Sequence, residues 1–339
     1  MAFLFHPIPS QRPMSSMLVP VYALFVLCCF CSLLFGAGSV SPMDAVQVLL
    51  GQGTDEAIFV VHELRLPRTI IGLIAGVCLG VSGVLMQSVT RNPLAEPGLL
   101  GVSAGSAFSV ALALALGMSV ATLPIELAQV GALVGCFFVI GIAKLQGQRN
   151  DPIRLVLAGA ALTSLLTALT SLLLMYNEFA ADEIRFWITG SIAGKRFDQL
   201  VEVVPSLVIA SLCSLYIVRP LASLILGENV AIGLGYRPQR VRLIVVFVVA
   251  LLVGTSTAIA GPIIFVGLVV PFVARALVGT DIRRTLWLCL PLGPLMIISA
   301  DILSRLIAQP TEMPLGVLTA IIGAPVLLLI VRAQRLPTL

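Results

Sequence analysis

Charged side chains are scarce in this 339-residue sequence: Asp, Glu, Lys and Arg make up 11% of it, against about 25% in an ordinary soluble chain. Hydrophobic residues make up 59%, and the mean hydropathy is +1.10. This balance excludes a soluble enzyme, a disordered protein and a nucleic-acid-binding protein. The net charge of +4 is too small to indicate a polyanionic partner. The sequence therefore predicts a polytopic membrane protein.

Motifs that carry chemistry are also missing. There is no Gly-x-x-x-x-Gly-Lys-Ser/Thr loop, so the chain does not bind and hydrolyse ATP by that route. No His-Glu-x-x-His, nucleophile elbow or cofactor fingerprint is present, and the only histidines, His6 and His62, lie outside the apolar runs. All seven cysteines fall inside apolar runs, where cysteine acts as a small hydrophobic residue. We therefore predict a chain that is not an enzyme and holds no metal or cofactor of its own.

Ionisable residues are almost absent from the apolar runs themselves. Ion-coupled carriers usually keep carboxylates or histidines in the middle of the membrane. Here the deep candidates are Asp301 and Arg305, which are spaced to pair as i and i+4 on a helix. If the protein transports something, we expect the energy to come from another subunit.

Apolar runs of the length that crosses a bilayer recur along the chain. About 20 helical residues are needed to cross a core of ~30 Å, and ten such runs are found. A β-barrel would show ~10-residue alternating segments instead. The sequence thus predicts an all-α bundle of about ten transmembrane helices. They lie near Met17–Gly36, Leu66–Val89, Gly101–Val120, Ile125–Ala143, Ile153–Met175, Leu200–Leu226, Val241–Ala260, Ile263–Val278, Leu286–Ile307 and Pro314–Val331.

The charges between these runs indicate the orientation. With ten spans, 14 basic residues fall on one side and 6 on the other, and the richer side is cytoplasmic by the positive-inside rule. Both termini are then cytoplasmic, and the first run is an uncleaved span rather than a signal peptide. The predicted organisation is a cytoplasmic tail at 1–16, a single ten-helix transmembrane domain at 17–335 and a short cytoplasmic end at 336–339.

Two arginines flank the start of the second run, in Arg65-Leu66-Pro67-Arg68, on the outer face that otherwise avoids positive charge. One interpretation is that they are anchors that set the depth of the span. The other is that they dock an acidic partner, since guanidinium groups pair with carboxylates. Arg305 lies on the same outer face and favours docking.

The second run also carries Gly72, Gly76 and Gly80, a spacing that allows close helix packing or, alternatively, a pore-lining helix or a subunit seam. The stretch 91–105 follows, with two prolines and three glycines that break the helix and restart it. Irregular backbone of this kind is tolerated in a membrane where protein buries it or a water-filled cavity borders it.

Several of these motifs together resemble the permease family of ABC importers for ferric siderophores, cobalamin and haem. The matching segments, which cover nearly the whole chain beyond the first run, are Arg65–Arg68 with Gln87, Asn92–Gly101, Leu157–Gly159, Arg185–Ser191, Gly233–Gly235, Gly261–Leu268, Ala300–Asp301 with Arg305, and Gly323–Val326. The segment Arg185–Ser191 looks closest to the ferric-siderophore members.

The resemblance implies a subunit of an importer in the bacterial inner (plasma) membrane. Two permease subunits, identical or related, would enclose a central pathway in the lipid bilayer, and two cytoplasmic ATPase subunits would bind ATP and magnesium and drive alternating access. A periplasmic or lipoprotein substrate-binding protein would deliver the ferric siderophore. No nucleic acid is implied.

The resemblance also assigns roles to residues. Arg65, Arg68 and Arg305 would meet glutamates of the binding protein. Asn92, Pro93 and Leu94 would belong to the cytoplasmic gate. The cytoplasmic segment 227–242 would seat in the ATPase; its expected contacts are Ala231, Gly233, Leu234, Gly235 and Arg240. The plainer interpretation of that segment is a basic loop that satisfies the positive-inside rule.

Alternatives remain at this stage. Cobalamin or haem is an alternative cargo within the same family. An ion-coupled secondary carrier that works alone is a less favoured hypothesis, because mid-membrane carboxylates are lacking. A membrane scaffold or receptor is a third, and the elaborate broken stretch at 91–105 speaks against it.

Overall fold

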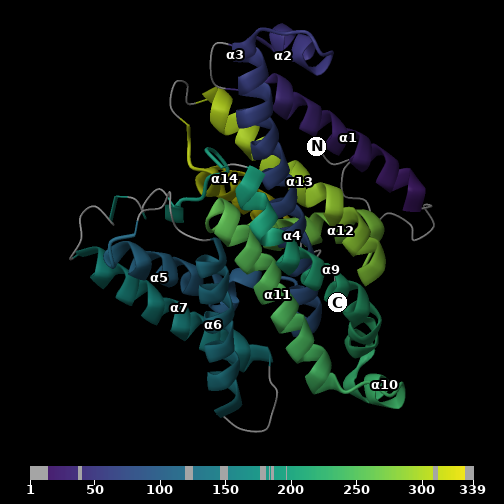
Figure 1. The fold of residues 1–339 in the computed structure, drawn as a ribbon. Coiled ribbons are helices and arrows are strands. Elements are labelled where there is room, and N and C mark those ends of the chain that lie inside the picture. The colour runs from purple at the N-terminus through teal and green to yellow at the C-terminus, as the bar shows by residue number, and fades with distance from the viewer. Residues whose placement is uncertain are drawn as a thin grey trace.

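The computed structural model describes residues 14–36, 40–118, 125–145, 152–175, 181–182, 184, 187–195, 197–307 and 312–332. Helices dominate these residues and no strand occurs among them, which confirms the all-α prediction (Figure 1). The predicted tails at 1–16 and 336–339 lie wholly or mostly outside the described residues.

The helices are α1 (Met14–Leu34), α2 (Pro42–Leu49), α3 (Asp55–Phe59), α4 (Leu66–Thr90), α5 (Val102–Ala115), α6 (Ile125–Leu145), α7 (Pro152–Met175), α9 (Phe197–Leu226), α10 (Glu228–Gly233), α11 (Pro238–Ala260), α12 (Val266–Val278), α13 (Ile282–Ile307) and α14 (Leu315–Arg332), with a π-helical turn η2 (Val60–Arg65) and a 3-10 turn η3 (Pro97–Leu100).

Seven of the described helical segments are long and apolar enough to cross a membrane. They coincide with seven of the predicted spans, so the chain is a multi-pass membrane protein. The other three predicted spans coincide with the shorter apolar stretches Val102–Ala115, Val266–Val278 and Leu315–Leu329. Each of these has fewer residues than the ~20 that a straight helix needs to cross a ~30 Å core.

Helix α4 occupies the centre of the bundle and packs against α11, α12 and α13 (Figure 1). Its glycines permit this packing. A Cβ added at Gly76 would lie 2.3 Å from the backbone nitrogen of Pro294, and one at Gly83 would lie 2.0 Å from the carbonyl oxygen of Gly267. The close-packing interpretation of the glycine stripe is therefore confirmed.

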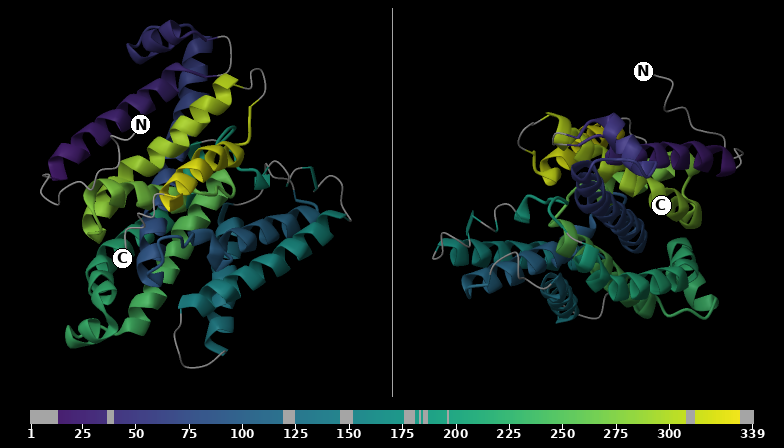
Figure 2. Two further views of the ribbon diagram at one scale, coloured as in Figure 1. Left: turned by 180° about the vertical axis from the view of Figure 1, so that it is seen from behind. Right: turned by 45° about the horizontal axis from the view of Figure 1, so that its top comes forward.

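Two groups of helices flank this centre. Helices α5, α6 and α7 pack together on one flank, and α1 and α14 both pack against α13 on the other (Figure 2). Cys28, Cys78, Cys136 and Cys289 are buried, and all seven cysteines are free, as expected of small hydrophobic residues.

The start of the second predicted span differs from the expectation. We expected a helix to begin at Leu66, with Pro67 in its first turn, but helical backbone already begins at Asp55 and runs to Thr90. The turn η2 lies just before Pro67, and the Leu66 N–H bonds to the carbonyl of Val61, five residues back. The π-helical turn precedes a proline that has no N–H to donate and whose ring crowds the preceding turn. Hydropathy alone carries no signal for such a change of hydrogen-bond register.

Candidate functional site

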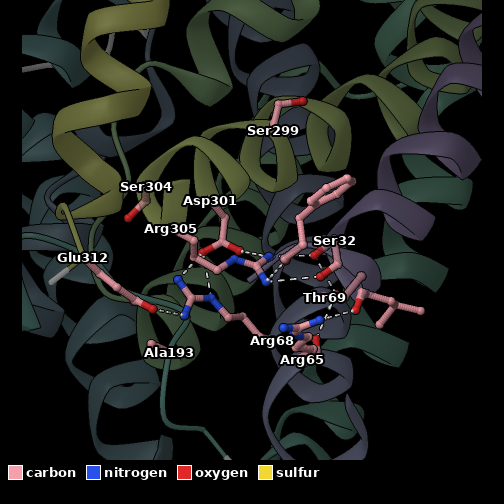
Figure 3. Close-up of polar contacts among 12 residues, drawn as sticks. Ser32, Arg65, Arg68, Thr69, Ala193, Ser299, Asp301, Ser304, Arg305 and Glu312 are labelled. Atoms are coloured by element: carbon pink, nitrogen blue, oxygen red, sulfur yellow. Dashed lines mark hydrogen bonds and ion pairs between the residues drawn. The ribbon is translucent and has the colours of Figure 1, made fainter. Parts of the chain in front are cut away.

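The C-terminal ends of α1 and α13 and the start of α4 bring together the three arginines predicted for docking (Figure 3). Arg65 ends η2, Arg68 lies in the first turn of α4, and Arg305 lies in the last turn of α13. Their grouping follows from the packing of α4 on α13 and of α13 on α1. Although they are far apart in sequence, the three side chains thus form one cluster.

Arg65 and Arg305 point inward, toward the end of α1. Arg65 is 3% exposed, and its Nη1 donates to the carbonyls of Leu33 and Leu34 at 3.0 and 2.8 Å. Arg305 is 2% exposed, and its Nη1 donates to the carbonyls of Ser32 and Phe35 at 3.1 and 3.0 Å. Neither guanidinium group lies open on the surface.

Arg305 and Arg68 also form ion pairs with acidic side chains. Arg305 Nη2 lies 2.5 Å from Asp301 Oδ2, which confirms the predicted i, i+4 pair. Arg68 Nε and Nη2 lie 2.8 and 2.6 Å from Asp301 Oδ1, and Arg68 Nη1 lies 2.7 Å from Glu312 Oε1 (Figure 3). Asp301 thus pairs with two arginines, whereas the ion pair of Glu312 among the described residues is with Arg68. The sequence did not reveal Glu312, because it lies 244 positions from Arg68.

The predicted gate residues lie in the turn that follows α4. The Oδ1 atom of Asn92 accepts the N–H of Leu94 at 2.9 Å, and the carbonyl of Asn92 accepts the N–H of Ala95 at 3.1 Å. The Asn92 side chain therefore stabilises the turn itself. Asn92 and Leu94 are exposed and Pro93 is partly buried, so the tip of this turn is accessible.

The same stretch then folds back into the bundle and meets a second irregular segment. Oε1 of Glu96 accepts the N–H of Phe265, at 3.1 Å, directly before α12 begins. Phe265 has a left-handed backbone, with φ of 69°. The broken stretch at 91–105 is thus fastened to the segment that joins α11 to α12.

The predicted ATPase-contacting segment contains the short helix α10. Ala231 is fully buried against the bundle, and its carbonyl accepts the N–H of Tyr236 at 2.9 Å. Gly233, Leu234, Gly235 and Arg240 are exposed, and so are the apolar side chains of Val230 and Ile232. Of the five predicted contacts, Ala231 therefore positions the helix, and the other four lie at the surface.

Another buried arginine, Arg275, joins α12 to α4. It is 3% exposed, lies in the last turn of α12 and donates through Nη2 to Gln87 Oε1 on α4. Gln87 Nε2 in turn donates to the carbonyl of Leu268 at 3.2 Å. The bundle therefore contains a buried cation in addition to the Asp301–Arg305 pair.

No group of three or more His, Cys, Asp and Glu side chains that could hold a metal ion occurs among the residues with described positions. The geometry of the whole arginine cluster is that of paired charges and helix-end hydrogen bonds. It offers recognition and fastening rather than bond-making chemistry.

Comparison with known proteins shows the family of the chain. Residues 24–333 match the FecCD transport family. The chain is 41% identical over 312 residues to the ferric enterobactin transport system permease protein FepD of Escherichia coli (strain K12), covering 92% of this chain and 93% of the relative. It is 34% identical to the probable siderophore transport system permease protein YfiZ of Bacillus subtilis (strain 168), covering 95% of this chain and 98% of the relative.

A solved structure agrees as well. A metal-chelate type ABC transporter in an inward-facing conformation superposes with a TM-score of 0.81 at 30% identity, over 94% of this chain and 99% of the other. The resemblance inferred from the sequence motifs is therefore confirmed, and the chain belongs to the FecCD transport family.

Proposed function

We propose that this chain is the membrane-spanning permease subunit of an ABC importer and that its cargo is a ferric siderophore. The observation that carries the proposal is the match over residues 24–333 to the FecCD transport family, joined with relatives named for ferric enterobactin and siderophore transport. The sequence contains no loop for ATP hydrolysis, so separate ATPase subunits supply the energy.

In this proposal the chain crosses the inner membrane ten times, with both termini in the cytoplasm. The ten crossings comprise the seven long helices and the three shorter ones, α5, α12 and α14. The shorter helices adjoin irregular segments, such as the stretch before α5 that Glu96 fastens to Phe265. Buried irregular backbone of this kind makes up the missing length within the membrane.

The exposed apolar surface of α10 supports an ATPase contact. Val230 and Ile232 are 43% and 58% exposed on this helix of six residues, which lies beyond the end of α9, and Leu234, directly after it, is 62% exposed. The close pair of Arg242 with Glu228 ties α10 to the start of α11. A short, fastened helix with an apolar face can seat in a groove of an ATPase and transmit its rotation to α9 and α11.

The substrate-binding protein docks at the opposite end, where the arginine cluster lies. A second permease subunit, identical or related, completes the pathway, and the gate near Asn92 opens toward the cytoplasm in the alternating-access cycle. Substrate choice then rests mainly with the binding protein.

Affinity purification and uptake measurements test this proposal. The tagged chain, expressed with its neighbouring genes, is expected to co-purify with an ATPase that carries a P-loop. Cells that lack the chain should lose uptake of radioactive iron delivered as a ferric siderophore, and the restored gene should recover it. Uptake of cobalamin or haem, but not of any ferric siderophore, would contradict the assigned cargo.

A further inference from the structure

The last carbonyl groups of α1 are hydrogen-bonded by arginines from two other helices. The final four carbonyls of any helix have no partner within the helix, and its C-terminal end favours positive charge. Here Arg305 donates hydrogen bonds to the carbonyls of Ser32 and Phe35, and Arg65 donates to those of Leu33 and Leu34. Two guanidinium groups thus cap one helix end (Figure 3).

Apart from its packing on α13, helix α1 makes few contacts with the other long helices. Only 6% of its most apolar 18-residue window is buried, against 78% for the segment that contains α4. Near the capped end, Ser32 Oγ lies 2.8 Å from Thr69 Oγ1, and Cys28 Sγ lies 3.5 Å from Ser299 Oγ on α13. The two arginines therefore hold α1 at the end where these contacts lie, while the Tyr22 hydroxyl donates to the carbonyl of Trp287, at 3.5 Å, farther back along the helix.

The backbone just after α1 leaves room for this cap. A Cβ added at Gly36 would lie 2.8 Å from Arg65 Nε. Arg65 also donates through Nη2 to the carbonyl of Val40 at 3.2 Å, so it holds the chain on both sides of the turn that leaves α1. Because its guanidinium group already donates to three backbone carbonyls, Arg65 has few N–H donors left for a partner protein.

Arg68 differs from the other two arginines. Its side chain is 11% exposed, and its contact with Glu312 joins it to a carboxylate that is 31% exposed, whereas Asp301 is only 3% exposed. Partly solvated ion pairs contribute little net stability, so an incoming carboxylate can replace one at small cost. Within the cluster, the Glu312 contact is the one that can be exchanged without exposing a buried charge.

We propose that the three arginines have divided roles: Arg65 and Arg305 fasten α1 by its terminal carbonyls, while Arg68 recognises the docking protein through a carboxylate that replaces Glu312. The second half of this division rests on the proposed function, because it needs a binding protein; the first half does not. Glu312 lies two residues before Pro314, just ahead of α14. The exchange therefore also releases the segment that leads into α14 from its contact with Arg68.

A disulfide reporter tests the fastening of α1 in the full chain without any partner. In a variant with Cys29 and Cys31 changed to Ser, Ser299→Cys places a thiol opposite Cys28, and a copper–phenanthroline oxidant forms the cross-link. The yield should fall strongly in Arg65→Gln and Arg305→Gln and stay unchanged in Arg68→Gln. Gly36→Ala keeps all three arginines and should also lower the yield by displacing Arg65. Full cross-linking in the Arg65 and Arg305 variants would overturn the fastening role.

Titration of the purified substrate-binding protein onto the permease–ATPase complex in phosphatidylcholine nanodiscs tests the exchange. Arg68→Gln should weaken binding by about tenfold or more, since a charge-assisted contact is lost. Glu312→Gln should tighten binding by about two- to fivefold, the range that a partly exposed ion pair allows. The matched control is Glu63→Gln, which removes the same charge from an exposed position of η2 without touching Arg68.

The outcomes separate the two proposals. If the wild-type complex binds no substrate-binding protein, the proposed function fails, while the cross-linking result still stands for α1. If the wild type binds but Glu312→Gln tightens binding no more than Glu63→Gln, the exchange is overturned. If phosphatidylglycerol in the nanodiscs removes the gain from Glu312→Gln, lipid phosphate occupies Arg68 and the assignment to a protein carboxylate is overturned.

Discussion

Gln87 of α4 makes two hydrogen bonds to α12: its Oε1 accepts one from the guanidinium group of Arg275, and its Nε2 donates one to the carbonyl of Leu268. The two residues lie 188 positions apart, and both are buried. Gln87 is also four residues before Arg91, where α4 ends in a left-handed residue and the broken stretch begins. One side chain thus fixes the helix end from which the predicted gate turn starts.

Removing the Gln87 side-chain acceptor should destabilise the bundle strongly. Gln87→Leu leaves the Arg275 charge buried without this partner, and an uncompensated buried charge costs about 3 kcal/mol or more. Gln87→Glu supplies a carboxylate in the same place and should retain the fold. Thermal unfolding in detergent compares the two; a Gln87→Leu protein as stable as the wild type would show that Arg275 does not depend on this contact.

The central glycines should tolerate no side chain. Gly83→Ala places a Cβ 2.0 Å from the carbonyl oxygen of Gly267, so α4 and α12 must separate, and overpacking of this kind costs about 1–3 kcal/mol or more. Gly141→Ala is the matched control, since nothing lies within 4 Å of a Cβ there and alanine favours the helix. Size-exclusion profiles and unfolding temperatures of the two variants should diverge. Equal behaviour would mean that the two helices are not in close contact.

Substitutions in α10 should separate assembly from folding. Leu234→Asp places a charge on an exposed apolar position, so the chain should fold but bind its ATPase at least about tenfold more weakly, since a charge is poorly tolerated in an apolar contact. Ala231→Asp places the same charge in a fully buried position and should destabilise the chain itself. Pull-down of the ATPase together with a monodispersity measurement distinguishes the two. An ATPase that binds the folded Leu234→Asp chain normally would place the contact elsewhere.

The spans could be predicted well because their signal is local. An apolar run as long as the bilayer is thick marks a helix wherever it occurs, and α4 ends within one residue of the predicted boundary at Val89. The Asp301–Arg305 pair was predictable for the same reason, since i and i+4 lie on one helix face whatever surrounds them.

The roles inside the arginine cluster could not be predicted in this way. The residue types and the outer face favoured docking for Arg65, Arg68 and Arg305 alike. What distinguishes them is which groups they bond: backbone carbonyls of α1 for Arg65, and the distant Glu312 for Arg68. Backbone carbonyls occur at every residue and leave no mark in the sequence, so only the packing of α1 against α13 and α4 reveals them. The burial of Arg275 beside Gln87 likewise depends on how α12 packs against α4, so it could not be predicted from the sequence either.

The central claim is that this chain is a permease that depends on ATP-hydrolysing partners. Uptake of ferric siderophore into proteoliposomes tests it most directly, with the chain reconstituted either alone or together with its partner permease, ATPase and substrate-binding protein. The account predicts accumulation only in the complete system and only when ATP is present on the side of the ATPase. Accumulation by this chain alone, driven by an ion gradient, would contradict it.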